Sequence, residues 1–309
     1  MGKWLQRLSG NPATRALALL HFAVFLWGFT AILGRLISFG ALPLVWHRLW
    51  ITALVLLLFR KTRQGLRQLS FKAWKIFGGI GLVVTAHWIC FYGAIKLANA
   101  SVALVALSTG PLFASAFEPL IFRSRFKMAQ VLTGLICVLG LTLIFREVPA
   151  VGLGLAVGVV AALLSALFST LNKKYLGAHS ATAVTWVELT AGWLALTPCM
   201  VMEESAVWWP QGLDFLWVAL LGIVCTALPF IISLQVLRHI SAFTANLAVN
   251  LEPVYGLLLA ALVFKEHTTL NALFYLGSGI ILLTVFISPI LENTQKFHRK
   301  GPSTKQNNL

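Results

Sequence analysis

Ten apolar runs in the sequence are each long enough to cross a lipid bilayer as a helix. A hydrocarbon core of about 30 Å requires roughly 20 helical residues. With 59% hydrophobic and 11% charged residues, the chain lies far from the average of soluble domains. The sequence therefore predicts an all-α integral membrane protein with ten transmembrane helices, at residues 16–38, 43–60, 74–96, 101–122, 127–146, 152–172, 181–202, 213–237, 242–264 and 269–290.

The basic residues lie on one side of these runs. If the N-terminus is cytoplasmic, the outer segments hold only Arg35, Lys96, Arg146 and Lys265, and every other Lys and Arg except Arg48 falls on the inner side. This asymmetry follows the positive-inside rule and places both termini in the cytoplasm, with the chain in the cytoplasmic (inner) membrane. The net charge of +15 is expected to face anionic lipid headgroups. No basic helix face or aromatic RNA motif accompanies it, so nucleic acid is not an expected partner.

An internal repeat relates the two halves of the chain. A shift of 142 positions places five residues of the ninth run on identical residues of the fourth, with Pro253 on Pro111. Each half contains five spans, an odd number, so the second half enters the membrane in the opposite orientation. The predicted organisation is a 5+5 inverted-topology repeat: a cytoplasmic N-terminal segment 1–15, five-helix repeats 16–146 and 152–290, and a basic cytoplasmic tail 291–309.

Three ionisable residues within the spans are candidates for function, because such a residue costs about 2.5 to 3.5 kcal/mol at a helix centre. Glu252 is interpreted either as a proton carrier or counter-charge for a cationic or zwitterionic substrate, or as a neutral acid beside a proline kink. Glu188 has similar alternatives. Arg48 either binds a substrate carboxylate or extends outward to lipid headgroups. Arg48 and Glu188 are mirror-related across the midplane, with depths that differ by roughly 10 Å, so no salt bridge is expected between them.

A polar face on the fourth span predicts a water-accessible cavity. Its residues recur at heptad-like spacing and therefore share one side of the helix: Ser101, Ser108, Pro111, Ser115 and Glu118. In the ninth span Asn250 is the equivalent of Ser108, and Asn246 lies one turn earlier. Glu252 lies about 200° around the helix from Asn250, so one of the two faces the cavity and the other a neighbouring helix.

Aromatic residues near the centres of two spans offer a second candidate surface. His87, Trp88 and Tyr92 lie in the third span, and Trp27 lies in the first. These side chains either line a cavity for aromatic or cationic solutes, through stacking and cation–π contact, or pack in the core. Pro111 and Pro253 are expected to supply helix bends.

Signatures of enzymes are missing from the sequence. The histidines have no ligand spacing, and no G-x-S-x-G, H-E-x-x-H or G-x-x-x-x-G-K-[ST] occurs. We therefore expect no metal, no cofactor and no enzymatic activity, with an intramembrane enzyme for lipid-linked substrates as the alternative function. A GxxxG match from Gly154 to Gly158 indicates either close helix packing or a homodimer.

The motifs resemble those of EamA-type exporters of the drug/metabolite transporter superfamily. The matching residues are Trp27-Gly28, Arg48-Leu49, Glu252-Pro253, the run from Phe264 to Thr268, and Gly277. The resemblance covers residues 16–290 and implies a central cavity lined mainly by spans 1, 3, 4, 6, 8 and 9. It also implies export of amino acids, related metabolites or drugs. Pro111 and Pro253 match the mid-helix prolines of the family and Glu266 the glutamate that follows span nine, whereas Ser124 departs from this pattern in the first half.

We therefore expect a secondary active transporter that exports small organic solutes by alternating access, driven by protons or another gradient. Its expected substrate-binding residues are Trp27, His87, Trp88, Tyr92, Ser108, Asn246 and Asn250. Its expected charge-carrying residues are Glu252, Glu188 and Arg48.

Overall fold

A computed structural model describes residues 12–147, 152–201 and 209–252, and part of the segment between 255 and 284. The described residues form helices and no strand. In chain order these are α2 (Pro12–Leu36), α3 (Ala41–Leu58), α4 (Arg60–Arg67), α5 (Phe71–Leu97), α6 (Ala100–Leu107), α7 (Gly110–Phe122), α8 (Met128–Glu147), α9 (Gly152–Tyr175), α10 (Ala181–Val201), α11 (Asp214–Gly222), the π-helix η2 (Ile223–Ala227), α12 (Leu228–Val236) and α13 (Ala242–Val249).

Helices occupy the first eight predicted spans and the start of the ninth, and the tenth lies largely outside the described residues. Within the described part of the chain, six helical segments are long and apolar enough to cross a membrane: Thr14–Leu36, Ala41–Leu58, Phe71–Leu97, Ala100–Phe122, Gly152–Tyr175 and Asp214–Val236. Large apolar side chains such as Leu58, Phe71 and Leu120 are exposed on the outside of the bundle, as lipid contact requires. The fold is therefore an all-helical, multi-pass membrane protein.

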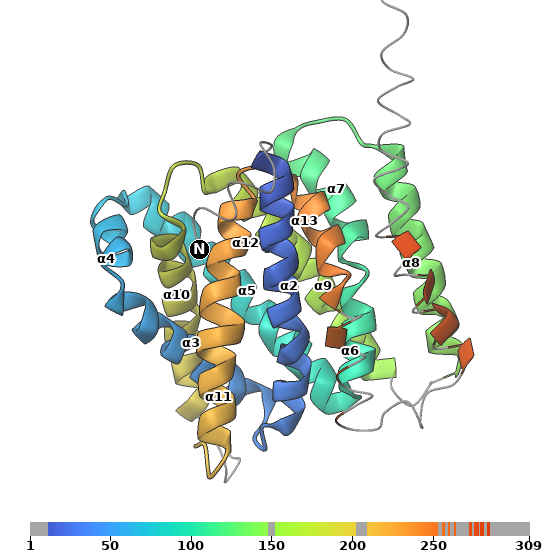
Figure 1. The fold of residues 1–309 in the computed structure, drawn as a ribbon, viewed down its shortest axis with the longest axis horizontal. Coiled ribbons are helices and arrows are strands. Elements are labelled where there is room, and N and C mark those ends of the chain that lie inside the picture. The colour runs from blue at the N-terminus through green and yellow to red at the C-terminus, as the bar shows by residue number, and fades with distance from the viewer. Residues whose placement is uncertain are drawn as a thin grey trace, which may run out of the picture.

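The bundle is arranged around α5, which packs along α9 on one side and α10 on another. The helix α3 packs against α10 and α11, and α2 packs against α12. The short basic helix α4 lies at one edge and α8 at the other (Figure 1). Sequence analysis did not predict α4, because its sequence RKTRQGLR has no apolar run and reads as a charged loop.

Two short helices 142 positions apart, α6 and α13, are built alike. Each has eight residues, and each begins with a capping side chain: Asn99 accepts from the Val102 N–H at 2.8 Å, and Ser241 accepts from the Thr244 N–H at 3.0 Å. Each helix ends in a turn, at Ser108 and at Asn250. The repeat found in the sequence is therefore also a repeat of local structure.

The fourth span is two helices joined by a turn, rather than one bent helix. The helix α6 ends at Leu107, a turn follows at Ser108 and Thr109, and Pro111 lies in the first turn of α7. A proline in that position removes no intrahelical hydrogen bond, since the first N–H groups of a helix have no partner within it. Pro253, its counterpart, lies outside the described residues.

Two close crossings of helix backbones join the halves of the chain. On α5, a Cβ added to Gly81 would collide with the backbone of Glu188 on α10. On α11, a Cβ added to Gly222 would lie 3.0 Å from the Ile51 side chain and 3.5 Å from the Arg48 carbonyl oxygen on α3. Small residues allow such contact between helices in a membrane, where packing rather than the hydrophobic effect holds helices together.

Replacing Gly81 by Ala should therefore destabilise the protein. The new methyl group meets backbone atoms, which cannot rotate away, and overpacking of this kind costs about 1–3 kcal/mol. Unfolding in detergent with increasing SDS would measure the loss. Gly79→Ala on the same helix is the matched control, because no atom lies within 4 Å of a Cβ there. Equal stability of the two variants would contradict the packing argument.

Candidate functional site

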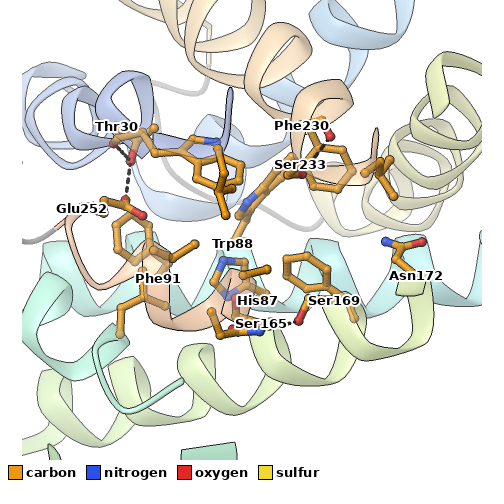
Figure 2. A pocket seen from close by; sticks show the side chains of 18 of the residues that line it. Thr30, His87, Trp88, Phe91, Ser165, Ser169, Asn172, Phe230, Ser233 and Glu252 are labelled. Atoms are coloured by element: carbon orange, nitrogen blue, oxygen red, sulfur yellow. Dashed lines mark hydrogen bonds between the residues drawn. The ribbon is translucent and has the colours of Figure 1, made fainter. Parts of the chain in front are cut away.

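A cavity of about 810 Å³, part of it open to solvent, lies inside the bundle. Its walls come from α2, α3, α5 and α6 in the first half of the chain and from α9, α12, α13 and Glu252 in the second. Aromatic side chains make up much of the surface: Trp27, Trp88, Phe91, Phe168 and Phe230. Figure 2 shows His87, Trp88 and Phe91 from α5 close to Ser165 and Ser169 from α9.

Arg48 is the cation of this cavity and is only 2% exposed. Its Nε donates to Thr226 Oγ1 at 2.5 Å and its Nη1 donates to Tyr92 Oη at 2.7 Å. The guanidinium carbon lies 3.8 Å from the centre of the Trp88 ring. These contacts hold Arg48 inside the bundle, so it does not extend to the headgroups.

The partners of Arg48 are neutral, and no carboxylate of the described residues forms an ion pair with it. A guanidinium has five N–H donors in a planar fork, of which the two hydrogen bonds use two. A buried cation with donors to spare is a receptor for an anionic group, since an unpaired charge away from water is unfavourable. Arg48 can thus bind a carboxylate in the cavity.

Glu252 lines the same cavity and is 5% exposed. Its Oε1 accepts from Thr30 Oγ1 at 3.3 Å, but that hydroxyl also lies 2.7 Å from the Trp27 carbonyl oxygen (Figure 2). A threonine hydroxyl has one hydrogen. Its main acceptor is the closer Trp27 carbonyl oxygen, so the hydrogen bond to the Glu252 carboxyl group is weak. Glu252 therefore retains acceptor capacity for an ammonium group or a proton.

A polar strip on α9 forms part of the cavity wall next to α5. Ser165, Ser169 and Asn172 are spaced four and three residues apart, which places them on one face of the helix. The Asn246 amide of α13 donates to Ser169 Oγ at 2.7 Å and, within its own helix, to the Ala242 carbonyl at 2.9 Å. The bond to Ser169 joins α13 to α9 along the cavity.

His87 lines the cavity, and one of its two ring nitrogens is already hydrogen-bonded. Its Nδ1 lies 2.7 Å from the carbonyl oxygen of Ala161 on α9. A carbonyl only accepts, so Nδ1 carries a hydrogen and donates it. The ring also packs against Phe91 and Phe168. His87 thus combines the two roles considered from the sequence, a cavity wall and a satisfied core histidine.

The structure brings together six of the residues singled out from the sequence around this cavity: Trp27, Arg48, His87, Trp88, Asn246 and Glu252. Tyr92 lies behind the wall and acts on the cavity through Arg48. Ser108 and Asn250 are buried but are not part of the lining, so Glu252, and not Asn250, faces the cavity. Glu188 lies elsewhere in the bundle, fully buried on α10.

The polar face predicted on the fourth span does not line this cavity. Ser108 Oγ donates to the Leu104 carbonyl at 3.3 Å, and Ser115 Oγ donates to the Leu112 carbonyl at 2.7 Å, so both hydroxyls are satisfied by their own helices. The helix α6 contributes only the apolar Leu107. Sequence analysis missed Thr30 and the strip on α9, although the spacing of Ser165, Ser169 and Asn172 was available as a signal.

Polar contacts join the segments at one end of the bundle, beyond the cavity. Asp214, at the start of α11, accepts from the Ser38 backbone N–H at 3.1 Å and from Ser38 Oγ at 2.5 Å, just after α2 ends. Lys96, near the end of α5, donates to the Ile37 carbonyl at 2.6 Å. The cavity extends the other way, toward Leu20, Asn172 and Leu237, where α2 begins and α9 and α12 end.

Comparison with known proteins identifies the class of this chain. Residues 14–146 and 152–288 each match the EamA-like transporter family, so the chain belongs to that family. An "Uncharacterized transporter" of Archaeoglobus fulgidus is 26% identical over 198 residues, which cover 64% of this chain and 70% of the relative. A protein of the same name from Clostridium kluyveri is 22% identical over 201 residues, 62% of this chain and 63% of that relative.

A solved structure titled "Crystal structure of protein" has the same fold, with a TM-score of 0.71 at 18% sequence identity. The match covers 92% of this chain and 99% of the other. Together with the family, the apolar helices make the protein a membrane transporter. The family and the names of its relatives favour transport over enzymatic activity.

The bond between Arg48 and Tyr92 can be measured by a double-mutant cycle. Hydrogen bonds to charged groups contribute about 1.5–3 kcal/mol, so Tyr92→Phe should lower the free energy of unfolding by that amount. In an Arg48→Met background the same change should cost much less, because the charged partner is gone. Tyr175→Phe, at the partly exposed end of α9, is the control. An unchanged cost of Tyr92→Phe in the double variant would rule out the bond.

Proposed function

We propose that the protein is a secondary active transporter that exports small organic solutes across the cytoplasmic membrane by alternating access. The observation that carries this proposal is a cavity, between the two halves of the chain, that contains both a buried cation and a carboxyl group. Arg48 and Glu252 line it without forming an ion pair with each other. Charged groups held apart inside a membrane favour a solute that carries the complementary charges.

The walls of the cavity narrow the class of solute. Arg48 offers donors to a carboxylate, and Glu252 offers an acceptor to an ammonium group. The rings of Trp27, Phe168 and Phe230 supply an apolar surface between and around them. The solute that fits this chemistry is a small amphoteric molecule with an aromatic or apolar body, such as an amino acid or a related metabolite.

Alternating access requires two halves that can rock, and we propose two five-helix units, 16–146 and 152–290, with opposite orientations. The matching helices α6 and α13 support this arrangement. So do the packing pairs: α5 lies against α9 and α10, and the corresponding second-half segment, α11 to α12, lies against α2 and α3. Gly81 and Gly222 are 141 positions apart, and the residues they approach, Glu188 and Arg48, are 140 apart.

The cavity supports a state open to the cytoplasm. It extends toward the end of the bundle where α2 begins, which the positive-inside rule places inside. At the opposite end, the bonds of Asp214 and Lys96 to the segment after α2 close the path. A solute would enter from the cytoplasm in this state and leave after those outer contacts separate.

Three related compounds test the roles of the two charges. Phenylalanine carries both groups, phenethylamine lacks the carboxylate, and 3-phenylpropionate lacks the ammonium. Arg48→Gln should lower transport of phenylalanine and phenylpropionate about 10- to 100-fold, since a charged hydrogen bond contributes roughly 1.5–3 kcal/mol, and should spare phenethylamine. Glu252→Gln should lower transport of phenylalanine and phenethylamine and should spare phenylpropionate. Uptake of radiolabelled compounds into proteoliposomes measures both.

Thr30→Val is a milder companion to the Glu252 variant, because it removes the hydroxyl group that Glu252 shares with the Trp27 carbonyl and leaves the carboxyl group in place. If Arg48→Gln lowers transport of all three compounds to the same extent, the substitution damages the fold rather than a carboxylate site. Absence of transport of any of them by the wild type would contradict the proposed solute class.

Orientation is tested by labelling single cysteines in a variant without the four native ones. Lys61→Cys on α4 and Gln211→Cys before α11 are both at exposed positions. In intact cells an impermeant maleimide should react with the cysteine at position 211 and, only after the membrane is permeabilised, with the one at position 61. Reaction at both positions from outside would contradict the proposed topology.

A further inference from the structure

The Glu188 carboxyl group is the least satisfied polar group of the described structure. Glu188 lies within α10 and is 0% exposed, and neither carboxyl oxygen has a hydrogen-bond partner among the described residues. On α9, Asn172 is 1% exposed, and its Oδ1 also has no donor there. The Asn172 side chain is within interaction range of the Glu188 carboxyl group, but no well-formed hydrogen bond joins them in the described conformation. Two neighbouring side chains thus have buried acceptor atoms without a donor.

No charge in the described surroundings compensates Glu188. The helices α3, α4, α5 and α12 pack against α10, and α9 brings Asn172 to it. The basic residues of these elements are His47, Arg48, Arg60, Lys61, Arg63, Arg67, Lys72, Lys75, His87, Lys96, Lys173 and Lys174, with none on α12, and the other titratable groups are Cys90, Tyr92 and Tyr175. None of them acts on the Glu188 carboxyl group. An ionised carboxylate in such a place is strongly unfavourable, because it has lost its water and gained no partner.

We propose that Glu188 and Asn172 form a proton-binding site separate from the substrate cavity. In the described conformation the carboxylate has taken up one proton, and the resulting O–H donates to Asn172 Oδ1. That single hydrogen neutralises the charge and satisfies the two acceptors together. The proposal rests on the proposed transport function and deepens it: Glu188 carries the proton, and Glu252 is left to contact the solute.

The position of Asn172 gives the proton a route. Asn172 belongs to the lining of the cavity, whereas Glu188 does not, so the amide lies between cavity water and the acid. A proton reaches Glu188 from the cavity side while the cavity is open. It leaves as H⁺, regenerating the carboxylate, when water reaches Glu188 in another conformation.

The contact between α5 and α10 couples that step to movement of the helices. Glu188 is fixed against Gly81, and one turn later Gly192 lies against the Thr85 hydroxyl group. At Gly81 no side chain separates the two backbones, so the crossing leaves no room for water between α5 and α10 at that point. Sliding or separation of α10 relative to α5 changes the solvation of Glu188 and with it the proton affinity.

Infrared spectroscopy of the purified wild-type protein in lipid tests the site without any solute. In a pH titration, the C=O band of a protonated carboxylic acid should persist to pH values at which exposed carboxylates are ionised. Glu188→Gln should remove the contribution of one carboxyl group to this band, and Glu252→Gln should leave that contribution in place. Asn172→Leu should move it to higher wavenumber, because the acid loses its hydrogen-bond acceptor. Gln at position 188 can still donate to Asn172, so the variant is expected to fold.

The infrared band alone tests the proposed proton site. Its absence from the wild type, or a band of unchanged size in Glu188→Gln, would overturn the site. An Asn172→Leu spectrum identical to that of the wild type would overturn the bond between the two residues.

A transport measurement then distinguishes the proposed proton site at Glu188 from the proposed transport function. Proteoliposomes loaded with the pH indicator pyranine should report proton movement when phenylalanine is added, and Glu188→Gln should abolish that movement. Proton movement of unchanged size in Glu188→Gln, or coupling to Na⁺ with no effect of a pH gradient, would overturn the assignment of Glu188. If the wild type transports none of the three phenyl compounds, the proposed function fails, while the infrared titration still tests the proton site.

Discussion

The structure depends on satisfying charges where the bilayer supplies no water. Arg48 meets this requirement within the protein: two hydroxyl groups accept its N–H bonds, and the face of Trp88 covers its guanidinium carbon. The hydroxyl of Thr226 also donates to the Leu221 carbonyl, so it acts both as an acceptor and as a donor. Holding one cation in place therefore fixes the relative positions of α3, α5 and η2.

The close crossings of glycine backbones work together with this charge. The Thr52 hydroxyl, one turn after Arg48, lies 2.8 Å from the Arg48 carbonyl oxygen and 2.7 Å from the Gly222 carbonyl oxygen and shares its one hydrogen between them. The bond to Gly222 is within reach because no side chain separates α3 from α11 there. Helix packing and polar satisfaction are thus two aspects of one interface, and in a membrane neither is replaced by the hydrophobic effect.

Much of the fold could be predicted from the sequence, because ten long apolar runs leave few alternatives to membrane helices. The helix α4 escaped prediction, since periodicity in an eight-residue charged segment is weak. The orientation of Glu252 was beyond sequence analysis for a physical reason. An angle of about 200° from Asn250 assumes a continuous helix, but the chain turns at Asn250 and Leu251 before it becomes helical again. The strip on α9 was predictable, because its three polar residues follow the helical period.

Because the chain is duplicated, its two halves share a backbone arrangement, while the side chains at equivalent positions differ in their chemistry. Gly81 approaches Glu188 as Gly222 approaches Arg48, and Thr85 and Thr226 follow their glycines by the same four residues. At equivalent crossings one half thus carries a cation and the other an acid. Their surroundings differ: Thr226 and Tyr92 serve Arg48, whereas only Asn172 faces Glu188. Under the proton-binding role proposed for Glu188, the duplicated frame carries a permanently charged site in one half and, in the other, a site whose charge changes during transport.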